Sequence, residues 1–138
     1  MLSVDIVPPR SFEVPVPHAL SPLQIAASLP ELWSPRVIGE ADDAFLKVAK
    51  VKGSLVWHSH ADEDEVFMVL QGRLRIEMTE GSVQLEEGQL YVVPKGVRHN
   101  PVAEEECLLL LVEKKTTRHT GEVTTEQTRS IAEQLRPL

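Results

Sequence analysis

The chain has 138 residues, which is enough for one domain with a single hydrophobic core and too few for two ordinary domains. Hydrophobic residues make up 42% and charged residues 25%, which are globular values, and no apolar run is long enough for a membrane span. A net charge of −7 and an aromatic content of 4% provide neither a basic phosphate-binding face nor a base-stacking platform, so we expect no nucleic-acid partner.

The start of the chain and its only cysteine both indicate the cytoplasm. Residues 1–5 lack the basic start and the apolar stretch of a secretory signal. Cys107 has no second cysteine with which to form a disulfide, and it borders the apolar run 108–111. We therefore predict a cytoplasmic protein in which Cys107 is a small buried hydrophobic residue.

Helix signals flank a long β-rich middle. Near the N-terminus, Ser21 can cap a helix, Pro22 suits its first position and Gln24 completes a capping box, which predicts a short helix to about Leu29. Residues 124–127 repeat this capping pattern ahead of residues 131–135, whose apolar members share one helical face. We expect this C-terminal helix to dock on the core.

Seven short aliphatic and β-branched runs, most of them separated by turn residues, occupy the middle of the chain. Their spacing is typical of an all-β sandwich or barrel, and helical periodicity is absent between them. We predict one domain over residues 1–138, with a barrel core at 36–113 on which the N-terminal and C-terminal extensions pack. The predicted strands are 45–51, 54–60, 65–70, 73–78, 83–86, 89–93 and 107–113.

The apolar pattern of these strands predicts which faces are covered. Leu74, Ile76 and Met78 alternate with charged residues, which is typical of an antiparallel strand with one buried face. The runs 65–70 and 108–112 are apolar on both faces and need a second covering layer. We expect the terminal segments and a second copy of the chain, in a homodimer, to supply it. The acidic residues 104–106 are interpreted as a solvated loop without a function.

Four side chains, those of His58, His60, Glu65 and His99, form the kind of donor set that binds a divalent metal. In a strand, His58 and His60 would project from one face, about 6.6 Å apart along the chain. Residues 61–64 can reverse the chain and place Glu65 on an adjacent strand, about 4.8 Å away, on the same face as Phe67. An ionised carboxylate there is costly unless it is paired or binds a cation.

His99 needs a long-range return of the chain, and the turn at residues 94–96 immediately before it makes this possible. A closed sheet could then bring His99 beside the other three ligands. Four protein ligands could close a tetrahedral structural site or leave positions open on an octahedral ion. Because the set has no cysteine and combines imidazoles with a carboxylate, we favour an open, reactive site.

The spacing of these ligands among glycines and a proline resembles the two motifs of the cupin family. Four residues separate Gly53 from His58, one separates His58 from His60, four separate His60 from Glu65, and six separate Glu65 from Gly72. The second motif runs from Gly88 through Pro94 and Gly96 to His99, after an interval of 15 residues. Two departures affect loops rather than ligands: the first interval is one residue short, and Ala103 stands where the second motif usually ends in Asn.

The resemblance implies an antiparallel jelly-roll barrel, commonly dimeric, that holds one divalent metal through the positions of His58, His60, Glu65 and His99. Glu65 is chosen over Glu63 as the ligand because of the six-residue spacing between Glu65 and Gly72. Family metals include manganese, iron, nickel, copper, cobalt and zinc, of which we rank manganese, iron and zinc first because ligand chemistry alone does not choose among them. Imidazoles must be neutral to ligate, so metal affinity is expected to fall as the pH drops through the imidazole range.

The favoured function is a metal-dependent enzyme acting on a small, oxygen-rich metabolite, with dioxygenation, isomerisation, decarboxylation and lyase chemistry all open. The alternative is a non-catalytic ligand-binding or sensing cupin with a structural metal. Sugar-phosphate isomerisation ranks third, because the chain shows no obvious basic phosphate cradle. No catalytic residue is assigned: Trp57, Tyr91, Arg98 and Asn100 adjoin the motifs without a predicted role, and His18 and His119 are expected at the surface.

Overall fold

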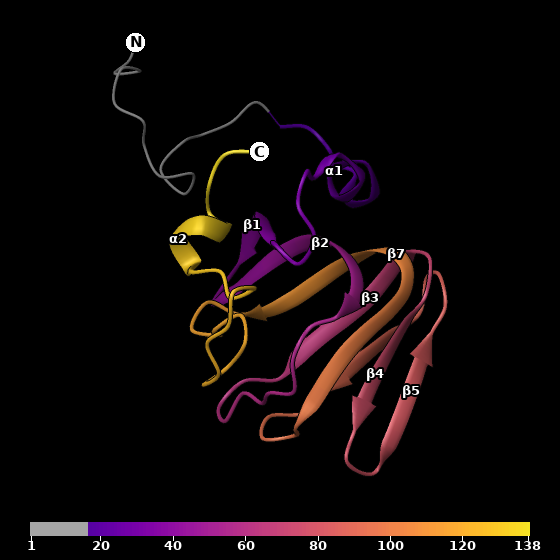
Figure 1. The fold of residues 1–138 in the computed structure, drawn as a ribbon. Coiled ribbons are helices and arrows are strands. Elements are labelled where there is room, and N and C mark those ends of the chain that lie inside the picture. Colours follow the sequence, from indigo (N-terminus) through magenta and orange to yellow (C-terminus); the bar gives the residue numbers. More distant parts are fainter. Residues whose placement is uncertain (1–16) are drawn as a thin grey trace.

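A computed structural model describes residues 17–138 of the protein. These residues contain seven antiparallel strands and two short helices (Figure 1). The N-terminal stretch from which we inferred a cytoplasmic location lies outside the described residues. No helix within residues 17–138 is long and apolar enough to cross a membrane. In chain order the elements are α1 (Pro22–Ser28), β1 (Arg36–Ala41), β2 (Ala44–Ser54), β3 (Glu65–Gln71), β4 (Leu74–Met78), β5 (Gly81–Leu85), β6 (Leu90–Val93), β7 (His99–Lys114) and α2 (Ile131–Gln134).

Strand β7 organises the barrel because it is long enough to pair with three other strands. It pairs with β2 over most of its length, while its first residues pair with β4 and its later residues pair with β3. Strands β1 and β6 extend the sheet at its two ends, and β5 forms a hairpin with β4. The predicted all-β, antiparallel jelly-roll barrel with short terminal helices is confirmed.

Two predictions in the sheet are wrong, and β1 (Arg36–Ala41) was not predicted as a strand. The segment 54–60 is not a strand, because β2 ends at Ser54 and the bridge between His58 and His99 that follows is isolated. The acidic residues 104–106 are exposed, as expected, but they lie within β7 rather than in a loop. The pairing of β2 with β7 resumes on both sides of them after a register shift, so the strand continues through the acidic run.

The N-terminal helix begins as predicted, whereas the C-terminal helix begins later. Ser21 caps α1 by accepting a hydrogen bond from the backbone N–H of Gln24 at 3.2 Å. Helix α2 is capped by Ser130, which forms a capping box with Glu133, and not by residues 124–127. The physical reason is local: the backbone N–H of Thr128 donates to the carbonyl of Thr125, which closes a turn where we expected the helix to start.

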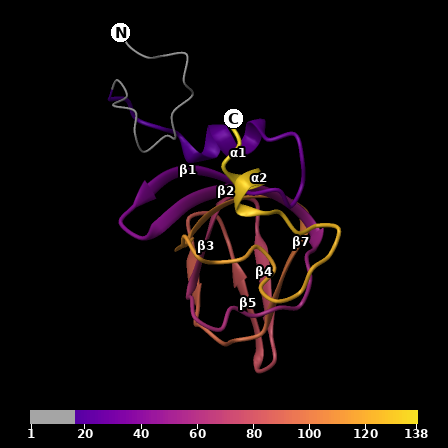
Figure 2. The ribbon, with the colours of Figure 1, turned by 90° about the vertical axis from the view of Figure 1, so that its left-hand side faces the viewer.

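The core confirms the alternation read from the strands. Leu74 and Ile76 are fully buried, and Glu65 shares the buried face of β3 with Phe67 and Val69. On the outer side, Ala26 of α1 and Leu29, which caps its C-terminal end, pack against buried side chains of β2 and β7. Figure 2 shows α1 and α2 together above β1 and β2, so terminal segments supply part of the predicted second layer.

Candidate metal centre

Three separate segments bring the predicted ligands together. His58 and His99 face each other as a two-residue bridge, in which each backbone N–H donates to the other's carbonyl at 3.0 and 2.9 Å. The carbonyl of His60 accepts from the N–H of Gly96 at 2.7 Å, which ties the first motif to the turn of the second. Glu65 opens β3.

The route by which Glu65 reaches the site differs from the prediction. Its neighbours across the sheet are Val93 of β6 and Glu113 of β7, not the segment that carries His58 and His60. The inward orientation of Glu65 is as predicted, because alternation along β3 sets it independently of which strand lies alongside.

The four donor atoms lie within 4.8 Å of one another, and all four side chains are buried. Oε1 of Glu65 is 3.2 Å from Nε2 of His99 and 3.3 Å from Nε2 of His60. The ring centroid of His58 lies 5.0 Å from that of His60 and 4.4 Å from that of His99. Such convergence of three imidazoles and a carboxylate is what a divalent ion requires.

Backbone carbonyls orient two of the imidazoles. Nδ1 of His58 is 2.7 Å from the carbonyl of Val56, and Nδ1 of His99 is 2.9 Å from the carbonyl of Val97. Since a carbonyl only accepts, each Nδ1 carries the proton and each Nε2 presents its lone pair to the centre of the cluster. This is the second-sphere arrangement that holds a histidine ready to ligate a metal.

The Nε2 atom of His60 tests whether the cluster fits a cation. It is buried and makes no hydrogen bond to any described residue, although the Glu65 carboxylate lies 3.3 Å away. A buried polar nitrogen without a partner is unfavourable, and a bound cation would satisfy it together with the other three donors. The residues therefore fit a divalent ion.

The electrostatics favour the protonation states that a metal needs. Burial lowers the pKa of His58 from 6.5 to about 4, which keeps its imidazole neutral at ordinary pH. Burial alone would raise the pKa of Glu65, but the pKa is held well below its usual value when Nε2 of His60 and of His99 carries a proton toward the carboxylate, and a cation at the same point would have the same effect. The site thus combines a neutral imidazole with an ionised carboxylate.

Behind Glu65 lies a buried charged pair that we did not predict. Lys47 of β2 is fully buried, and its Nζ donates to the carboxylate of Glu113 and to the side-chain oxygen of Gln134 in α2. Burial, and then the charge of Glu65, raise the pKa of Glu113 well above its usual value. Strand alternation could have predicted that both side chains are buried. Lys47 shares a face of its strand with buried Ala49, and Glu113 shares one with buried Leu111.

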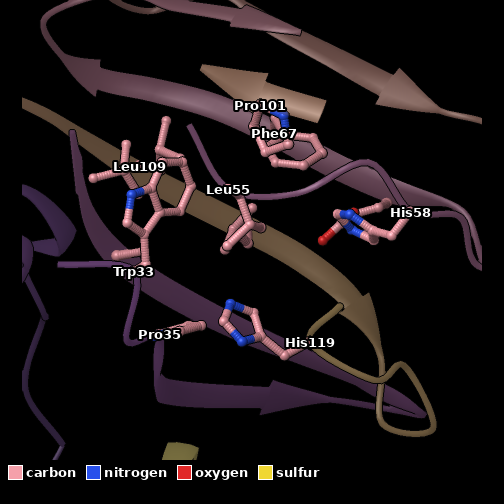
Figure 3. Close-up of a pocket in the computed structure, with 12 residues that line it drawn as sticks. Trp33, Pro35, Leu55, His58, Phe67, Pro101, Leu109 and His119 are labelled. Atoms are coloured by element: carbon pink, nitrogen blue, oxygen red, sulfur yellow. The ribbon is translucent and has the colours of Figure 1, made fainter. Parts of the chain in front are cut away.

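The cluster opens onto a small, mainly apolar cavity (Figure 3). His58 and Glu65 belong to its lining, so a molecule inside it would meet the candidate metal centre. The indole Nε1 of Trp33 donates to the carbonyl of Lys52 at 2.8 Å, which satisfies the only polar atom of that side chain. The remaining walls are apolar: Trp33, Pro35, Ala49, Val51, Leu55, Phe67, Pro101, Leu109 and Leu111.

His119 was expected at the surface, and this prediction is wrong. It is only half-exposed and lines the cavity, and Figure 3 shows its ring projecting into the same space as Leu55 and His58. Burial lowers its pKa from 6.5 to about 4. No sequence signal pointed to His119, because it follows the barrel in a segment without periodicity, whereas His18 is exposed as expected.

The other residues beside the motifs do not line this cavity. The guanidinium of Arg98 lies 5.5 Å from the ring centroid of Trp57, a cation–π contact away from the cluster. Asn100 is buried and donates to the hydroxyl of Ser54 at 2.9 Å, which is a structural contact. Cys107 is buried, which confirms the prediction, and burial raises the pKa of its thiol to about 12.

Comparisons with known proteins agree with this fold. Residues 45–113 match the family model Cupin_2, described as a cupin domain. The chain is 32% identical over 94 residues to the uncharacterized protein YdbB of Bacillus subtilis strain 168, covering 67% of this chain and 83% of that protein.

Solved structures show the same similarity. A cupin-2 domain containing protein from Shewanella frigidimarina NCIMB 400 has a TM-score of 0.67 and 43% identity, covering 69% of this chain and 93% of that one. Protein NMB1881 from Neisseria meningitidis has a TM-score of 0.64 and 31% identity, covering 70% of this chain and 99% of that one. In each of these relatives the similarity spans most of the relative's own length.

Proposed function

The chain belongs to the cupin family, and we propose that it is a metal-dependent enzyme whose small substrate binds through oxygen to a divalent ion held by His58, His60, Glu65 and His99. The observation that carries this proposal is the convergence of four buried donor atoms within 4.8 Å beside a cavity. His58 and Glu65 line that cavity, so a molecule inside it would reach the ion.

A divalent ion at this position would polarise a bound oxygen and lower the pKa of bound water. The protein's own residues supply the rest. The carbonyls of Val56 and Val97 fix the imidazoles of His58 and His99, the apolar walls exclude water, and Glu65 supplies the negative charge. Manganese, iron and zinc remain our first choices, and dioxygenation, isomerisation, decarboxylation and lyase chemistry remain open.

The cavity lining bears on the substrate. The sequence led us to an oxygen-rich metabolite, but the walls away from the metal centre are apolar, so we place the oxygen atoms of the substrate at the metal end. Sugar-phosphate isomerisation is disfavoured because no lysine or arginine is among the residues that line this cavity. Homodimerisation and a cytoplasmic location stay predictions.

A non-catalytic binding or sensing cupin is the second candidate. One observation favours it: apart from His58 and Glu65, His119 is the only titratable side chain that lines the cavity in the described part of the chain. A reaction that needs several proton transfers would have few groups to perform them. Recovery of a tightly bound metabolite, unchanged after long incubation with metal-loaded protein, would favour this candidate.

Elemental analysis of natively purified protein tests the proposal first. We expect about one divalent ion per chain, retained by His18→Gln, whose histidine is exposed outside the site, and lost from His99→Gln. Iron, copper or nickel would call for an oxygen-consumption screen of candidate substrates. Turnover of a discovered substrate that survives complete removal of the metal would show that the protein is not a metal-dependent enzyme.

A further inference from the structure

The segment that follows β7 is built into the wall of the metal centre, although it lies beyond residues 45–113 that match the cupin domain. Gly121 has φ +60°, and a Cβ added there would lie 2.2 Å from the carbonyl oxygen of Ser59, the residue between His58 and His60. The hydroxyl of Thr120, which is fully buried, lies 2.7 Å from that of Thr128 and holds the segment folded on itself. The position of His119 is therefore determined by close packing.

The hydrogen bonding of His119 determines which of its ring nitrogens carries the proton. The backbone N–H of Arg129 donates to Nδ1 of His119 at 2.9 Å. Since this N–H can only donate, Nδ1 is the acceptor and the neutral ring carries its proton on Nε2. Nε2 has no partner among the described residues, and the ring lines the cavity beside the metal centre. A donor without a partner at a cavity wall is suited to binding a ligand acceptor.

We propose that the cavity binds a compact molecule with an apolar body, whose one end ligates the metal through oxygen and whose other polar atom accepts a hydrogen bond from Nε2 of His119. This inference rests on the proposed metal site and specifies the ligand class that the site takes. The apolar body is required by the walls formed by Trp33, Leu55 and Phe67, because hydroxyl groups facing them would lose their hydrogen bonds to water.

A matched pair of probes tests the ligand class on full-length, Mn²⁺-loaded protein. α-Hydroxyisobutyrate and glycerate chelate through the same α-hydroxycarboxylate group and have the same number of non-hydrogen atoms, but only the former has an apolar body. We expect α-hydroxyisobutyrate to bind at least about tenfold more tightly in calorimetric titrations, since glycerate would bury an unpaired hydroxyl. Equal affinities, or tighter binding of glycerate, would overturn the apolar ligand class.

Two substitutions of His119 test the hydrogen bond. His119→Phe keeps a flat ring and removes the donor to the carboxylate oxygen that α-hydroxyisobutyrate does not use for chelation. We therefore expect this probe to bind about three- to tenfold more weakly. His119→Gln restores an N–H donor and should recover most of this loss, while Mn²⁺ affinity stays unchanged in both variants. Unaltered probe binding in His119→Phe would refute the donor role, and so would Mn²⁺ affinity that falls as far as in His99→Gln.

The outcomes separate this inference from the proposed function. If the wild-type protein fails to bind Mn²⁺, zinc or iron, the proposed metal site is wrong and the ligand assignment falls with it. If the metals bind normally but the probes show neither preference nor dependence on His119, only the ligand assignment is wrong. Thermal melting of each variant shows that it is folded, and the comparison of the two probes needs no variant at all.

Discussion

Replacing the carboxylate of Glu65 with an amide is the sharpest test of the metal centre. Glu65→Gln changes one oxygen to nitrogen and removes the negative charge, while it keeps the length of the side chain. The matched control is Glu63→Gln, two residues away on the exposed approach to β3. Glu63 accepts a hydrogen bond from the hydroxyl of Thr116 at 2.9 Å and lies outside the cluster.

The size of the effect follows from the burial of Glu65 and its place in the cluster. Two unit charges about 4 Å apart interact by about 4 kcal/mol at an effective dielectric constant of about 20. A ligating oxygen lies closer than this to an ion of double charge, but the amide oxygen of Gln can still ligate. We expect a net loss of about 3 kcal/mol, which weakens metal binding about a hundredfold. Glu63→Gln should change the affinity by less than about threefold.

Competition against a chelator of known affinity measures both dissociation constants, with Mn²⁺ and then with Zn²⁺. Circular dichroism of the metal-free proteins establishes that both variants retain the β-barrel. Equal weakening by Glu65→Gln and Glu63→Gln would refute our assignment of Glu65 from its spacing to Gly72. Unchanged affinity in both variants would refute carboxylate ligation altogether.

Three further predictions concern stability and the packing of the site. Because the pKa of His58 and of His119 is about 4 when folded and 6.5 ordinarily, the unfolded chain takes up protons that the folded chain does not. The free energy of unfolding of the metal-free protein, measured with urea, should therefore fall by up to about 3 kcal/mol per histidine between about pH 6.5 and pH 4. Gly121→Ala should destabilise the protein by more than about 2 kcal/mol and weaken metal binding, because its Cβ displaces the segment packed on the metal-site loop. Lys47→Met should cost about 3–5 kcal/mol in urea unfolding, because the buried side-chain oxygens of Glu113 and Gln134 both lose their donor.

Each of these predictions has a control within the chain. His119→Phe should flatten part of the pH dependence, and a stability that does not change with pH would contradict the buried neutral imidazoles. Gly96 also has a positive φ, of +82°, but open space around its Cβ position, so Gly96→Ala isolates the backbone strain from the steric clash. Lys50→Met changes a half-buried lysine on the same strand, and an equal cost there would contradict the special role of Lys47.

Much of the metal centre could be read from residues close together in sequence. Alternation along β3 turned Glu65 inward with Phe67 whatever strand lay beside it, because successive side chains of a strand point to opposite faces. The cap at Ser21 was predictable for the same reason: its hydrogen bond spans three residues. The spacing of the histidines and glycines pointed to the cluster that the fold assembles.

The same local rules failed in two places, one decided by a long-range contact and the other by a competing local turn. The segment carrying His58 and His60 lies outside the sheet, and its position depends on the isolated bridge from His58 to His99, at the other end of the motif region. The capping pattern at residues 124–127 was overruled by a turn, and Ser130 took its place. Propensity ranks such alternatives by small energy differences, which a tertiary contact or a competing turn easily exceeds.

The sequence by itself therefore determined the fold class, the inward set of strand residues and the identity of the four candidate ligands, because alternation, turns and spacing act over a few residues. Only the tertiary structure decided which side chains surround those ligands. Strand β7 pairs with three strands and so sets Glu113 beside Glu65, and the tight contact of Gly121 with Ser59 brings His119 to the cavity. These approaches depend on register and packing between distant segments, which no local pattern encodes.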